Sequence, residues 1–374
     1  MPARTSRVPF VDLRATNLPL RDELLSDFSA LLERGNFVGG AEVEAFEAAF
    51  ASYCRTTHCV GTASGLDALR LALLASGLER GDEVLVPANT FVATFEAVVQ
   101  AGGTPVAIDV SETDYNLDVE AAEAAVTPRT RFVLPVHLYG QMADMRAVGR
   151  LAERHGLRIV EDACQAHGAR RDGVAAGTAG VAAAFSFYPA KNLGAAGDAG
   201  ALVTDDATLA GIALALRQHG EVDKYRSVYP GYTARLDSIQ AIVLNRKLPL
   251  LDAWNDQREQ AASFYDAELA GVGDLRLPPR APGSTPVWHL YVVRSAWRAE
   301  LAAHLDERGI ATGRHYPEPA HLSEAFAWLA DGEGAHPVTE ALADELLSLP
   351  IFPGIDPEQL EAVVGAVRSF FARD

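Results

Sequence analysis

The chain has 374 residues, enough for two domains, and its 49% hydrophobic and 22% charged content is ordinary for a folded globular protein. Its formal net charge of -18 at pH 7 argues against a nucleic-acid partner, which needs excess Lys and Arg, but it permits a small anionic ligand held by local amides and cations. Three cysteines without a CxxC spacing, and no apolar run as long as a signal peptide core or a membrane span, lead us to expect a cytoplasmic protein with no membrane partner and no metal site.

Short apolar runs alternate with amphipathic stretches between residues 57 and 205, a pattern typical of strands joined by crossover helices. Met145, Val148 and Leu151, for example, recur at helical spacing with polar residues between them. Because the connections are long, parallel pairing should dominate. We therefore predict an α/β fold, a three-layer αβα arrangement around a mainly parallel seven-stranded sheet. The predicted strands are HCVG, EVLVP, PVAID, RFVLPVH, RIVED, AAFSFY and GALVT.

The alternating pattern of apolar runs and amphipathic stretches ends before about residue 235. Residues Arg235–Leu269 predict a long helix with a break near Pro249, and the proline-rich stretch Leu277–Pro286 predicts an extended linker. The strand-like run VWHLYVV follows, then a helix AELAAHLDERG and two terminal helices. We expect a large domain over residues 1–245, with a helical segment at its N-terminus, and a smaller α+β domain over residues 246–374.

Lys191 lies in a glycine- and alanine-rich stretch, SFYPAKNLGAAGDAG, between two apolar runs. A lysine after a strand is most often a surface residue. Alternatively, a partly desolvated lysine has a lowered pKa and attacks carbonyl groups to form a Schiff base. Small neighbours favour the second interpretation, because they let a flat cofactor approach the backbone closely. The stretch alone leaves both interpretations open.

Two more features follow predicted strands. Asp162, in RIVEDACQAHGA, ends a central strand, where open α/β sheets bind ligands. It either caps the next helix or faces a cofactor's pyridine nitrogen, where an opposite charge at about 4 Å is worth roughly 4 kcal/mol at an effective dielectric near 20. Gly65 opens a helix after another strand, so it is either a plain turn or part of a phosphate site. No dinucleotide fingerprint accompanies it, which argues against a nicotinamide enzyme.

Nine motifs occur together and in order along the chain. With them the chain resembles, over nearly its whole length, the DegT/DnrJ/EryC1/StrS family of pyridoxal phosphate-dependent sugar aminotransferases. The resemblance implies the aspartate aminotransferase fold, fold type I, and a homodimer with shared active sites. The motifs are FVGG, ASGLDAL, GDEVLVPANTFVAT, PVHLYGQ, VEDACQAHGA, FSFYPAKNLGAAGDAGA, RLDSIQA, WHLYVV and RHYPEPAH.

The resemblance also implies roles for individual residues around pyridoxal 5'-phosphate. Lys191 would form the Schiff base and move protons, Asp162 would face the pyridine nitrogen, and Gln165 would neighbour the phenolic oxygen. Ser186 would bind the phosphate. Phe91 would stack on the ring, although without the family it would be assigned to ordinary core. The implied cofactor-binding residues are Gly65, Leu66, Phe91, Asp162, Gln165, Ser186, Lys191 and Thr233.

Two positions depart from the family pattern. Leu66 stands where the family commonly has Thr, so only its backbone N–H is available to the phosphate. Thr233, in GYTARLD, stands where the family has an Asn that reaches across the dimer interface to the partner's phosphate. A threonine side chain is shorter, which puts this cross-subunit contact in question. Some members carry histidine in place of the lysine and catalyse deoxygenation, so Lys191 favours transamination.

The same resemblance implies that the amino donor is L-glutamate and that the acceptor is a nucleotide-linked keto-deoxysugar. We expect the nucleotide to be dTDP and the amination to take place at carbon 3 or carbon 4. Lys224, Tyr225 and Arg226 form a loop near the diphosphate by this analogy, or else an ordinary solvated loop. His315 and Tyr316 match a stretch near the sugar, or else pack at a domain interface. Antibiotic amino sugars and cell-surface sugars are both natural contexts.

Two alternative functions remain from the sequence. One is an aminotransferase of the same fold that acts on a cyclic ketone without a nucleotide. The other is a non-enzymatic regulatory role, as described for some family members. A regulatory protein needs no Schiff-base lysine, yet Lys191 and Asp162 are both present.

Overall fold

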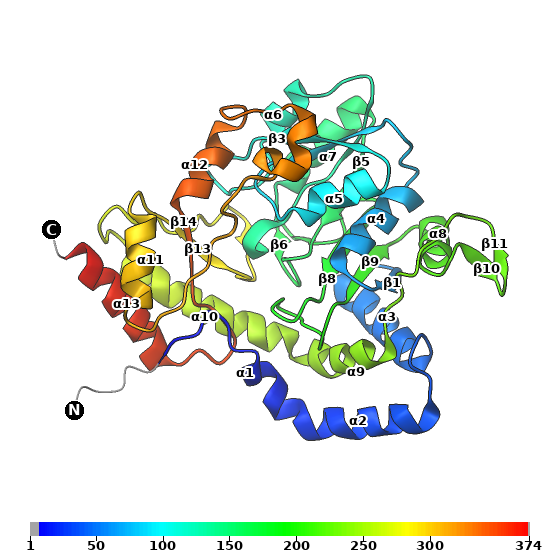
Figure 1. Ribbon diagram of the computed structural model, residues 1–374, viewed down its shortest axis with the longest axis horizontal. Coiled ribbons are helices and arrows are strands. Elements are labelled where there is room, and N and C mark those ends of the chain that lie inside the picture. Colours follow the sequence, from blue (N-terminus) through cyan, green and yellow to red (C-terminus); the bar gives the residue numbers. More distant parts are fainter. Residues whose placement is uncertain (1–6, 373–374) are drawn as a thin grey trace.

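A computed structural model describes residues 7–372 of the chain (Figure 1). The seven strands expected from the sequence form one sheet in the order β1-β9-β8-β5-β4-β2-β3. Neighbouring strands are parallel except at β9, which runs antiparallel to β1 and to β8. The mainly parallel seven-stranded sheet is therefore confirmed. Its strands are β1 (His58–Thr62), β2 (Glu83–Pro87), β3 (Thr104–Ile108), β4 (Thr130–Val133), β5 (Arg158–Asp162), β8 (Ala182–Ser186) and β9 (Gly200–Thr204).

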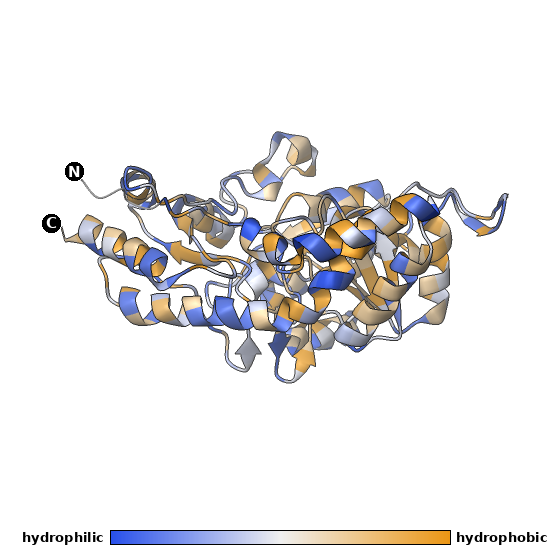
Figure 2. Ribbon diagram, turned by 90° about the horizontal axis from the view of Figure 1, so that it is seen from below, coloured by the Kyte–Doolittle hydropathy of each residue, from blue (hydrophilic) through white to orange (hydrophobic). Residues whose placement is uncertain are grey.

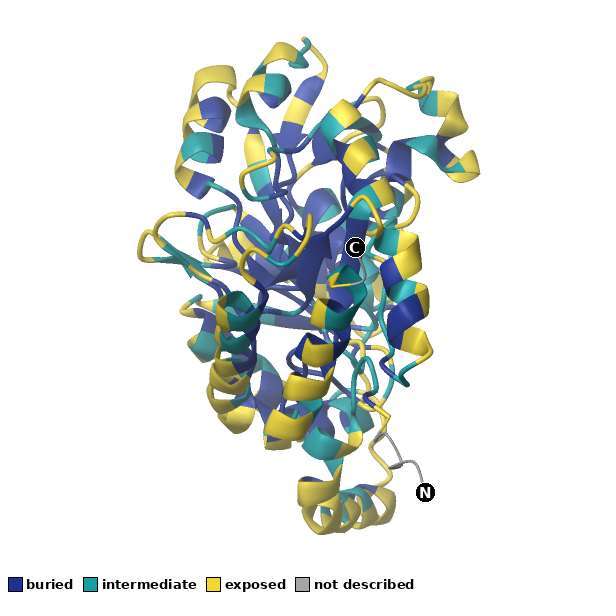
Figure 3. Ribbon diagram, turned by 90° about the vertical axis from the view of Figure 1, so that its left-hand side faces the viewer, coloured by how far each residue is buried: buried dark blue, intermediate teal, exposed yellow. Residues whose placement is uncertain are grey.

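Helices cover both faces of this sheet. Successive residues of a strand point to opposite faces, so Leu85 packs with α3, α6 and α7, whereas Val84 and Val86 pack with α4, α5 and α8. Figure 2 shows the strands largely in hydrophobic colours, and Figure 3 shows the sheet buried between helices with exposed outer faces. The predicted αβα layers are confirmed. The helices are α3 (Ala41–Cys54), α4 (Gly65–Ala75), α5 (Ala93–Gln100), α6 (Val119–Ala124), α7 (Met145–His155) and α8 (Ala207–Arg217).

The long helical stretch is present, and it breaks where the sequence has proline. Helix α9 (Ser238–Lys247) passes through the short turn η3 (Leu248–Leu250) into α10 (Leu251–Leu269). Pro249 lies within η3. A proline removes one N–H donor and crowds the preceding turn, so the α-helix is interrupted at this point. The predicted linker is extended, and part of it forms a small sheet. In that sheet β12 (Ser284–Thr285) pairs with β6 (Arg170–Arg171), which pairs with β7 (Val174–Ala175).

The C-terminal part has its own core. The predicted strand β13 (Tyr291–Arg294) pairs antiparallel with β14 (Leu346–Leu349), which the sequence did not predict. Val8, from near the other end of the chain, packs into this core and bridges to Ile310. The predicted division at residue 245 falls within α9 and stays a prediction. The helices of this part are α11 (Arg298–Asp306), η4 (Ala320–Leu322), η5 (Glu324–Leu329), α12 (Pro337–Glu345) and α13 (Pro357–Phe371).

Two segments extend from the body of the molecule (Figure 1). Helix α2 (Arg21–Arg34), which follows α1 (Arg14–Asn17) and η1 (Leu18–Leu20), packs against α9. A hairpin of β10 (Glu221–Asp223) and β11 (Arg226–Ser227) projects beyond α8. Within residues 7–372, no helix combines the length and the apolar character needed to cross a membrane.

Candidate active site

A pocket of about 610 Å³ opens at the carboxyl ends of the central strands. Its walls come from the residues that follow β1, β2, β4, β5 and β8, and from segments of the C-terminal part. Parallel strands end at the same edge of a sheet, which is why motifs far apart in sequence meet there. The pocket brings together these predicted site residues: Gly65, Leu66, Phe91, Asp162, Gln165, Ser186, Lys191, His315 and Tyr316.

Lys191 belongs to the pocket wall, in a tight loop after β8. Its backbone N–H donates to the carbonyl of Tyr188 at 2.8 Å, and Ala195 N–H closes the loop onto the carbonyl of Phe187 at 2.8 Å. Burial lowers the pKa of the Lys191 ammonium, while the negative charge of Asp162 acts in the opposite direction. A lysine held in this way supplies a neutral amine more readily than a surface lysine does.

Asp162 is buried and its carboxylate is fixed by two donors. Oδ2 accepts a hydrogen bond from Thr94 Oγ1 at 2.8 Å, and Oδ1 accepts one from Cys164 N at 3.1 Å. A turn, not a helix, follows the strand, so the helix-capping interpretation of Asp162 is wrong. The two bonds orient the carboxylate at the edge of the pocket, where it can stabilise a positive charge.

Gly65 begins α4 directly against β8. Ser64 caps this helix, because its Oγ accepts the N–H of Asp67 at 3.0 Å. A Cβ on Gly65 would lie only 2.7 Å from Cβ of Ser186 and 2.9 Å from Sγ of Cys164. Glycine is therefore required by the close approach of the helix start to Ser186, and the first amides of α4 lie at the pocket wall.

Gln165 is oriented by a tyrosine pair. Its Oε1 accepts the backbone N–H of Tyr139 at 2.7 Å, and its Nε2 donates to the hydroxyl of Tyr316 at 2.9 Å. The ring of Tyr316 in turn lies 5.6 Å from that of Phe91. Phe91 is 51% exposed, so its assignment to ordinary core is wrong and its face is available to a flat ligand.

His315 lies beside these groups as a neutral side chain. Its ring stacks on Phe10 at 5.6 Å, and its Nδ1 is 2.8 Å from the hydroxyl of Ser348. Burial, assisted by the charge of Lys191, lowers the pKa of His315 to about 4. The hydroxyl of Tyr139 donates to its backbone carbonyl. His315 therefore borders the pocket as a fixed polar group and not as a cation.

Four residues expected near the ligands lie away from this pocket. Lys224, Tyr225 and Arg226 belong to the projecting hairpin, where Tyr225 is 86% exposed and Arg226 pairs with Asp223 at 3.2 Å. The hydroxyl of Thr233 lies 3.4 Å from Nε2 of His219, outside the pocket lining. Within one chain these residues do not line the pocket, so their predicted roles stay predictions.

The sequence did not single out several residues that line or support the pocket. His289 and Arg258 line it, as do Phe10 and Val11 from the N-terminal segment, and Tyr139 supports it from behind. His289 and Tyr139 do lie within motifs that carried the resemblance, WHLYVV and PVHLYGQ. The other three carried no sequence signal, since only the folded chain brings them to the sheet edge.

Comparisons with known proteins agree with this geometry. The sequence matches the DegT/DnrJ/EryC1/StrS aminotransferase family over residues 19–368. It is 49% identical over 371 residues to dTDP-3-amino-3,4,6-trideoxy-alpha-D-glucose transaminase of Streptomyces venezuelae, covering 99% of this chain and 98% of that protein. It is 47% identical over 362 residues to the erythromycin biosynthesis sensory transduction protein EryC1 of Saccharopolyspora erythraea, covering 97% and 99%.

Solved structures give the same result. The crystal structure of S. venezuelae DesV in complex with ketimine intermediate has a TM-score of 0.96 and 50% identity, and the match covers 98% of this chain and 99% of that one. NtdA from Bacillus subtilis with bound cofactor PMP has a TM-score of 0.91 and 31% identity, covering 98% and 86%. The fold type and the family predicted from the motifs are confirmed. The chain belongs to the DegT/DnrJ/EryC1/StrS aminotransferase family.

Proposed function

We propose that this protein is a pyridoxal 5'-phosphate-dependent aminotransferase that moves the amino group of L-glutamate to the keto group of a dTDP-linked keto-deoxysugar. The observation that carries the proposal is the meeting of Lys191, Asp162 and the Gly65–Ser186 contact in one pocket. An amine, a carboxylate and a helix N-terminus are the three groups that this cofactor needs for its aldehyde, its ring nitrogen and its phosphate.

The relatives support carbon 3 as the position of amination. The S. venezuelae relative at 49% identity and one from Micromonospora megalomicea at 44% are both named dTDP-3-amino-3,4,6-trideoxy-alpha-D-glucose transaminase. A relative from Aneurinibacillus thermoaerophilus at 40% is named for dTDP-3-amino-3,6-dideoxy-alpha-D-galactopyranose. We therefore choose carbon 3 over carbon 4, and a deoxysugar on dTDP as the acceptor.

The pocket residues fit pyridoxal 5'-phosphate on two structural grounds. Because Gly65 has no Cβ, the first amides of α4 lie close to Ser186, and a phosphate can bind to these groups. Phe91 offers an exposed ring face in the pocket that the fixed carboxylate of Asp162 also lines. When bound, the cofactor supplies the electron sink that makes amino transfer possible.

The protein's own residues then have separate tasks. Lys191 would hold the cofactor through its amine and, as a free amine, would take and return a proton at the reacting carbon. Asp162 holds a proton on the ring nitrogen, since its carboxylate is already oriented by Thr94 and Cys164. Gln165 presents an amide beside the phenolic oxygen. The proposed phosphate ligands are Ser186, Gly65 and the backbone N–H of Leu66. The proposed sugar contacts are His315 and Tyr316.

We further propose a homodimer in which each hairpin serves the partner's pocket. Leu18, Leu25 and Leu32 recur every seven residues along η1 and α2, and they are 61%, 56% and 55% exposed. An exposed apolar row of this kind is typical of an interface. The dimer would bring Lys224, Tyr225 and Thr233 to a pocket that they do not reach within their own chain. A monomer in solution with full turnover would contradict this arrangement.

The test is incubation of the purified protein with L-glutamate and a panel of dTDP- and UDP-linked ketosugars, followed by mass spectrometry of the products. We expect the mass change of a keto-to-amino conversion, together with 2-oxoglutarate. In Lys191→Ala we expect turnover to fall by roughly 10⁴-fold and the cofactor's absorbance near the visible edge to be lost. Full activity in Lys191→Ala would rule out the proposed chemistry.

A regulatory function is the second candidate, because two relatives have names of this kind, EryC1 and a protein of Geobacillus stearothermophilus. The pleiotropic regulatory protein of Geobacillus stearothermophilus is 43% identical over 366 residues. A regulatory protein would show no product with any sugar of the panel, and its function would survive Lys191→Ala. An aminotransferase for cyclic ketones would bind the cofactor but would not bind a nucleotide sugar.

A further inference from the structure

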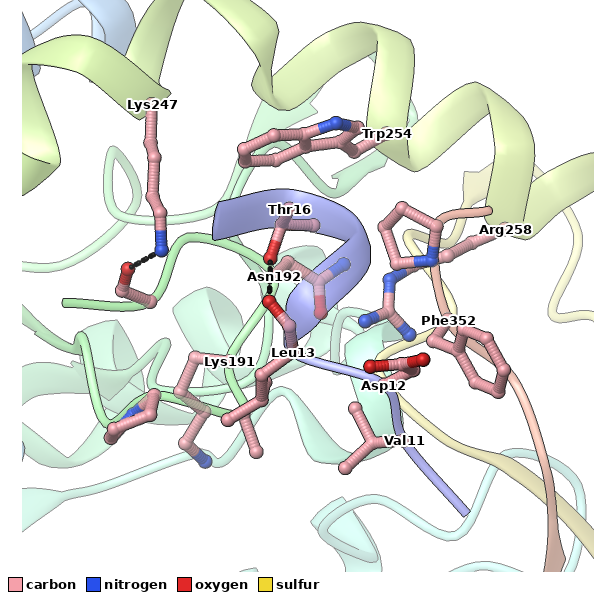
Figure 4. A pocket seen from close by; sticks show the side chains of 14 residues that line it. Val11, Asp12, Leu13, Thr16, Lys191, Asn192, Lys247, Trp254, Arg258 and Phe352 are labelled. Carbon is pink, nitrogen blue, oxygen red and sulfur yellow. Dashed lines mark hydrogen bonds between the residues drawn. The ribbon is translucent and has the colours of Figure 1, made fainter. Parts of the chain in front are cut away.

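The loop that carries Lys191 contacts helices α9 and α10 on the side that faces away from the main pocket. Residues 187–199 form neither helix nor strand between β8 and β9. A Cβ on Gly194 would lie 2.2 Å from the carbonyl oxygen of Pro189, so the two ends of the loop are in contact. Lys191 lines the main pocket, whereas Asn192 and Gly194 line a small cavity behind the loop and not the main pocket (Figure 4). The loop therefore has a pocket side and a rear side.

Lys247 is a buried cation on this rear side. It is the last residue of α9 and is 2% exposed, and its Nζ donates to the carbonyl oxygen of the buried Gly194 at 2.7 Å (Figure 4). Burial lowers the pKa of its ammonium to about 8, and no acidic residue in the described range 7–372 offsets this shift. A methionine would fill the same space without the cost of burying a charge. What lysine adds at this position is a donor for a loop carbonyl that would otherwise be buried without a partner.

Two further polar side chains of the same helices reach the loop. The buried Asn192, which follows the reactive lysine, donates from Nδ2 to Oδ1 of Asn255 on α10 at 2.8 Å. Beyond the loop's tight turn, Oε1 of Gln240 on α9 accepts the backbone N–H of Ala196 at 2.9 Å. Gln240 and Lys247 are seven residues apart, close to two helical turns, so both side chains leave the same side of α9. One face of the helix pair therefore bonds the loop at three points.

We propose that these three side chains, with Lys247 the most important, position the reactive Lys191, an inference that rests on the proposed aminotransferase function. In that function Lys191 alternates between an attached and a free amine, so its side chain must move while its backbone stays in place. Lys247 holds the backbone three residues from Lys191, and Asn255 holds the residue next to it. None of the three positioning residues lines the main pocket, so they act through the loop and not on the substrate.

The test is the rate at which pyridoxal 5'-phosphate attaches to Lys191 when it is added to the cofactor-free full chain, followed by absorbance. Lys247→Met removes the donor and keeps the apolar stem. We expect attachment to slow by roughly 10-fold or more, and kcat to fall by a similar factor with an unchanged KM for the nucleotide sugar, because a displaced amine costs rate and not substrate affinity. Attachment at the wild-type rate would overturn the proposal, and so would a raised KM with an unchanged kcat.

Asn255→Ala and Asn245→Ala are a matched pair on the two helices. Both side chains are half-buried and each donates to a backbone carbonyl at 2.9 Å, but only Asn255 is also bonded to the Lys191 loop. We expect similar losses of unfolding free energy in urea, with attachment slowed by roughly threefold or more in Asn255→Ala and by less than about twofold in Asn245→Ala. Equal attachment rates in the two variants would contradict the proposal. This pair also decides the matter if Lys247→Met does not fold.

Hydrogen exchange of the cofactor-free full chain gives a measurement that does not depend on activity. We expect the amides of residues 187–196 to exchange faster in Lys247→Met and Asn255→Ala than in the wild type or Asn245→Ala, and unchanged exchange in this segment would sink the proposal. Turnover of the ketosugar panel is measured separately. A wild type that attaches the cofactor but forms no product counts against the proposed function, whereas normal turnover with equal attachment rates in all variants counts against this inference alone.

Discussion

The main pocket and the β10–β11 hairpin hold their polar side chains in opposite ways. In the pocket, the carboxylate of Asp162 has two donors and the amide of Gln165 is bonded at both ends. On the hairpin, Tyr225 is 86% exposed, and the side chains of the ion pair Arg226–Asp223 are 69% and 71% exposed. The difference shows that one chain fixes the polar groups of the pocket by itself, whereas it leaves the hairpin side chains exposed, as the proposed contact with a partner subunit requires.

The largest effect after loss of Lys191 should come from Asp162→Asn. The amide keeps the shape of the carboxylate but removes the negative charge that, by our proposal, holds a proton on the cofactor's ring nitrogen. An opposite charge about 4 Å away is worth at most about 4 kcal/mol at an effective dielectric near 20, so we expect kcat to fall by roughly 100- to 1000-fold. Asp198→Asn, an exposed carboxylate of the same pocket, is the control. Equal losses in both variants would mean that overall pocket charge matters, and not the orientation of Asp162.

Gly65→Ala tests whether the pocket is preorganised by close packing. The new methyl group would meet Cβ of Ser186 at 2.7 Å, so the start of α4 must shift and cofactor affinity should fall by roughly 10-fold or more. The measurement is the dissociation constant of the cofactor by absorbance titration. Gly149→Ala, within α7 where a Cβ meets no atom within 4 Å, should leave this constant unchanged and stabilise the fold by up to about 1 kcal/mol. Unchanged affinity in Gly65→Ala would contradict the phosphate site.

The sequence predicted the sheet because strands buried on both faces are uninterrupted apolar runs, such as the fully buried β2 and β9. It did not predict β14 or the bridge from Val8 to Ile310, because both exist only through pairing with distant segments. Two-residue strands such as β12 are too short to leave a pattern.

The same limit applies to the site. Lys191, Asp162 and Gly65 could be singled out, since each lies at or just after the end of a recognisable strand and such strand ends converge, but only the family motifs implied their roles. Arg258 could not be predicted, because an arginine in a long helix is usually exposed and only the folded structure shows that this one is buried. The partners of Gln165 were equally hidden, since Tyr316 lies 151 residues away in the chain.

His315 should make the stability of the protein depend on pH. Its pKa is about 4 in the folded protein and about 6.5 in an unfolded chain. The folded state therefore binds fewer protons, and stability that is complete above about pH 6.5 is lost as the pH falls toward 4. Between pH 7 and pH 5 this one residue should cost up to about 2 kcal/mol.

The measurement is urea unfolding of the wild type and His315→Gln at pH 7 and pH 5. We expect a smaller loss of unfolding free energy in His315→Gln. Some loss should persist, because burial also lowers the pKa of His167, to about 3. Tyr225→Ala, on the exposed hairpin, should show the same loss as the wild type. An identical pH dependence in all three proteins would mean that His315 is not buried as the structure has it.

The smallest expected effect is on the hairpin. In the double variant Lys224→Ala, Arg226→Ala we expect KM for the nucleotide sugar to rise by roughly 5- to 10-fold at low ionic strength, with kcat unchanged, because exposed cations attract a diphosphate weakly and through a screened field. The increase should shrink in high salt. Arg80→Ala, an exposed arginine elsewhere, should leave KM unchanged.

Mixed dimers show which pocket the hairpin serves. In a dimer of one Lys191→Ala subunit and one hairpin-variant subunit, the only active pocket lies in the hairpin-variant chain. If the hairpin of the partner reaches that pocket, the intact hairpin of the Lys191→Ala subunit supplies the cations and KM returns to the wild-type value. If KM stays raised, the hairpin serves its own subunit, and the contrast between a self-contained pocket and a partner-dependent hairpin fails.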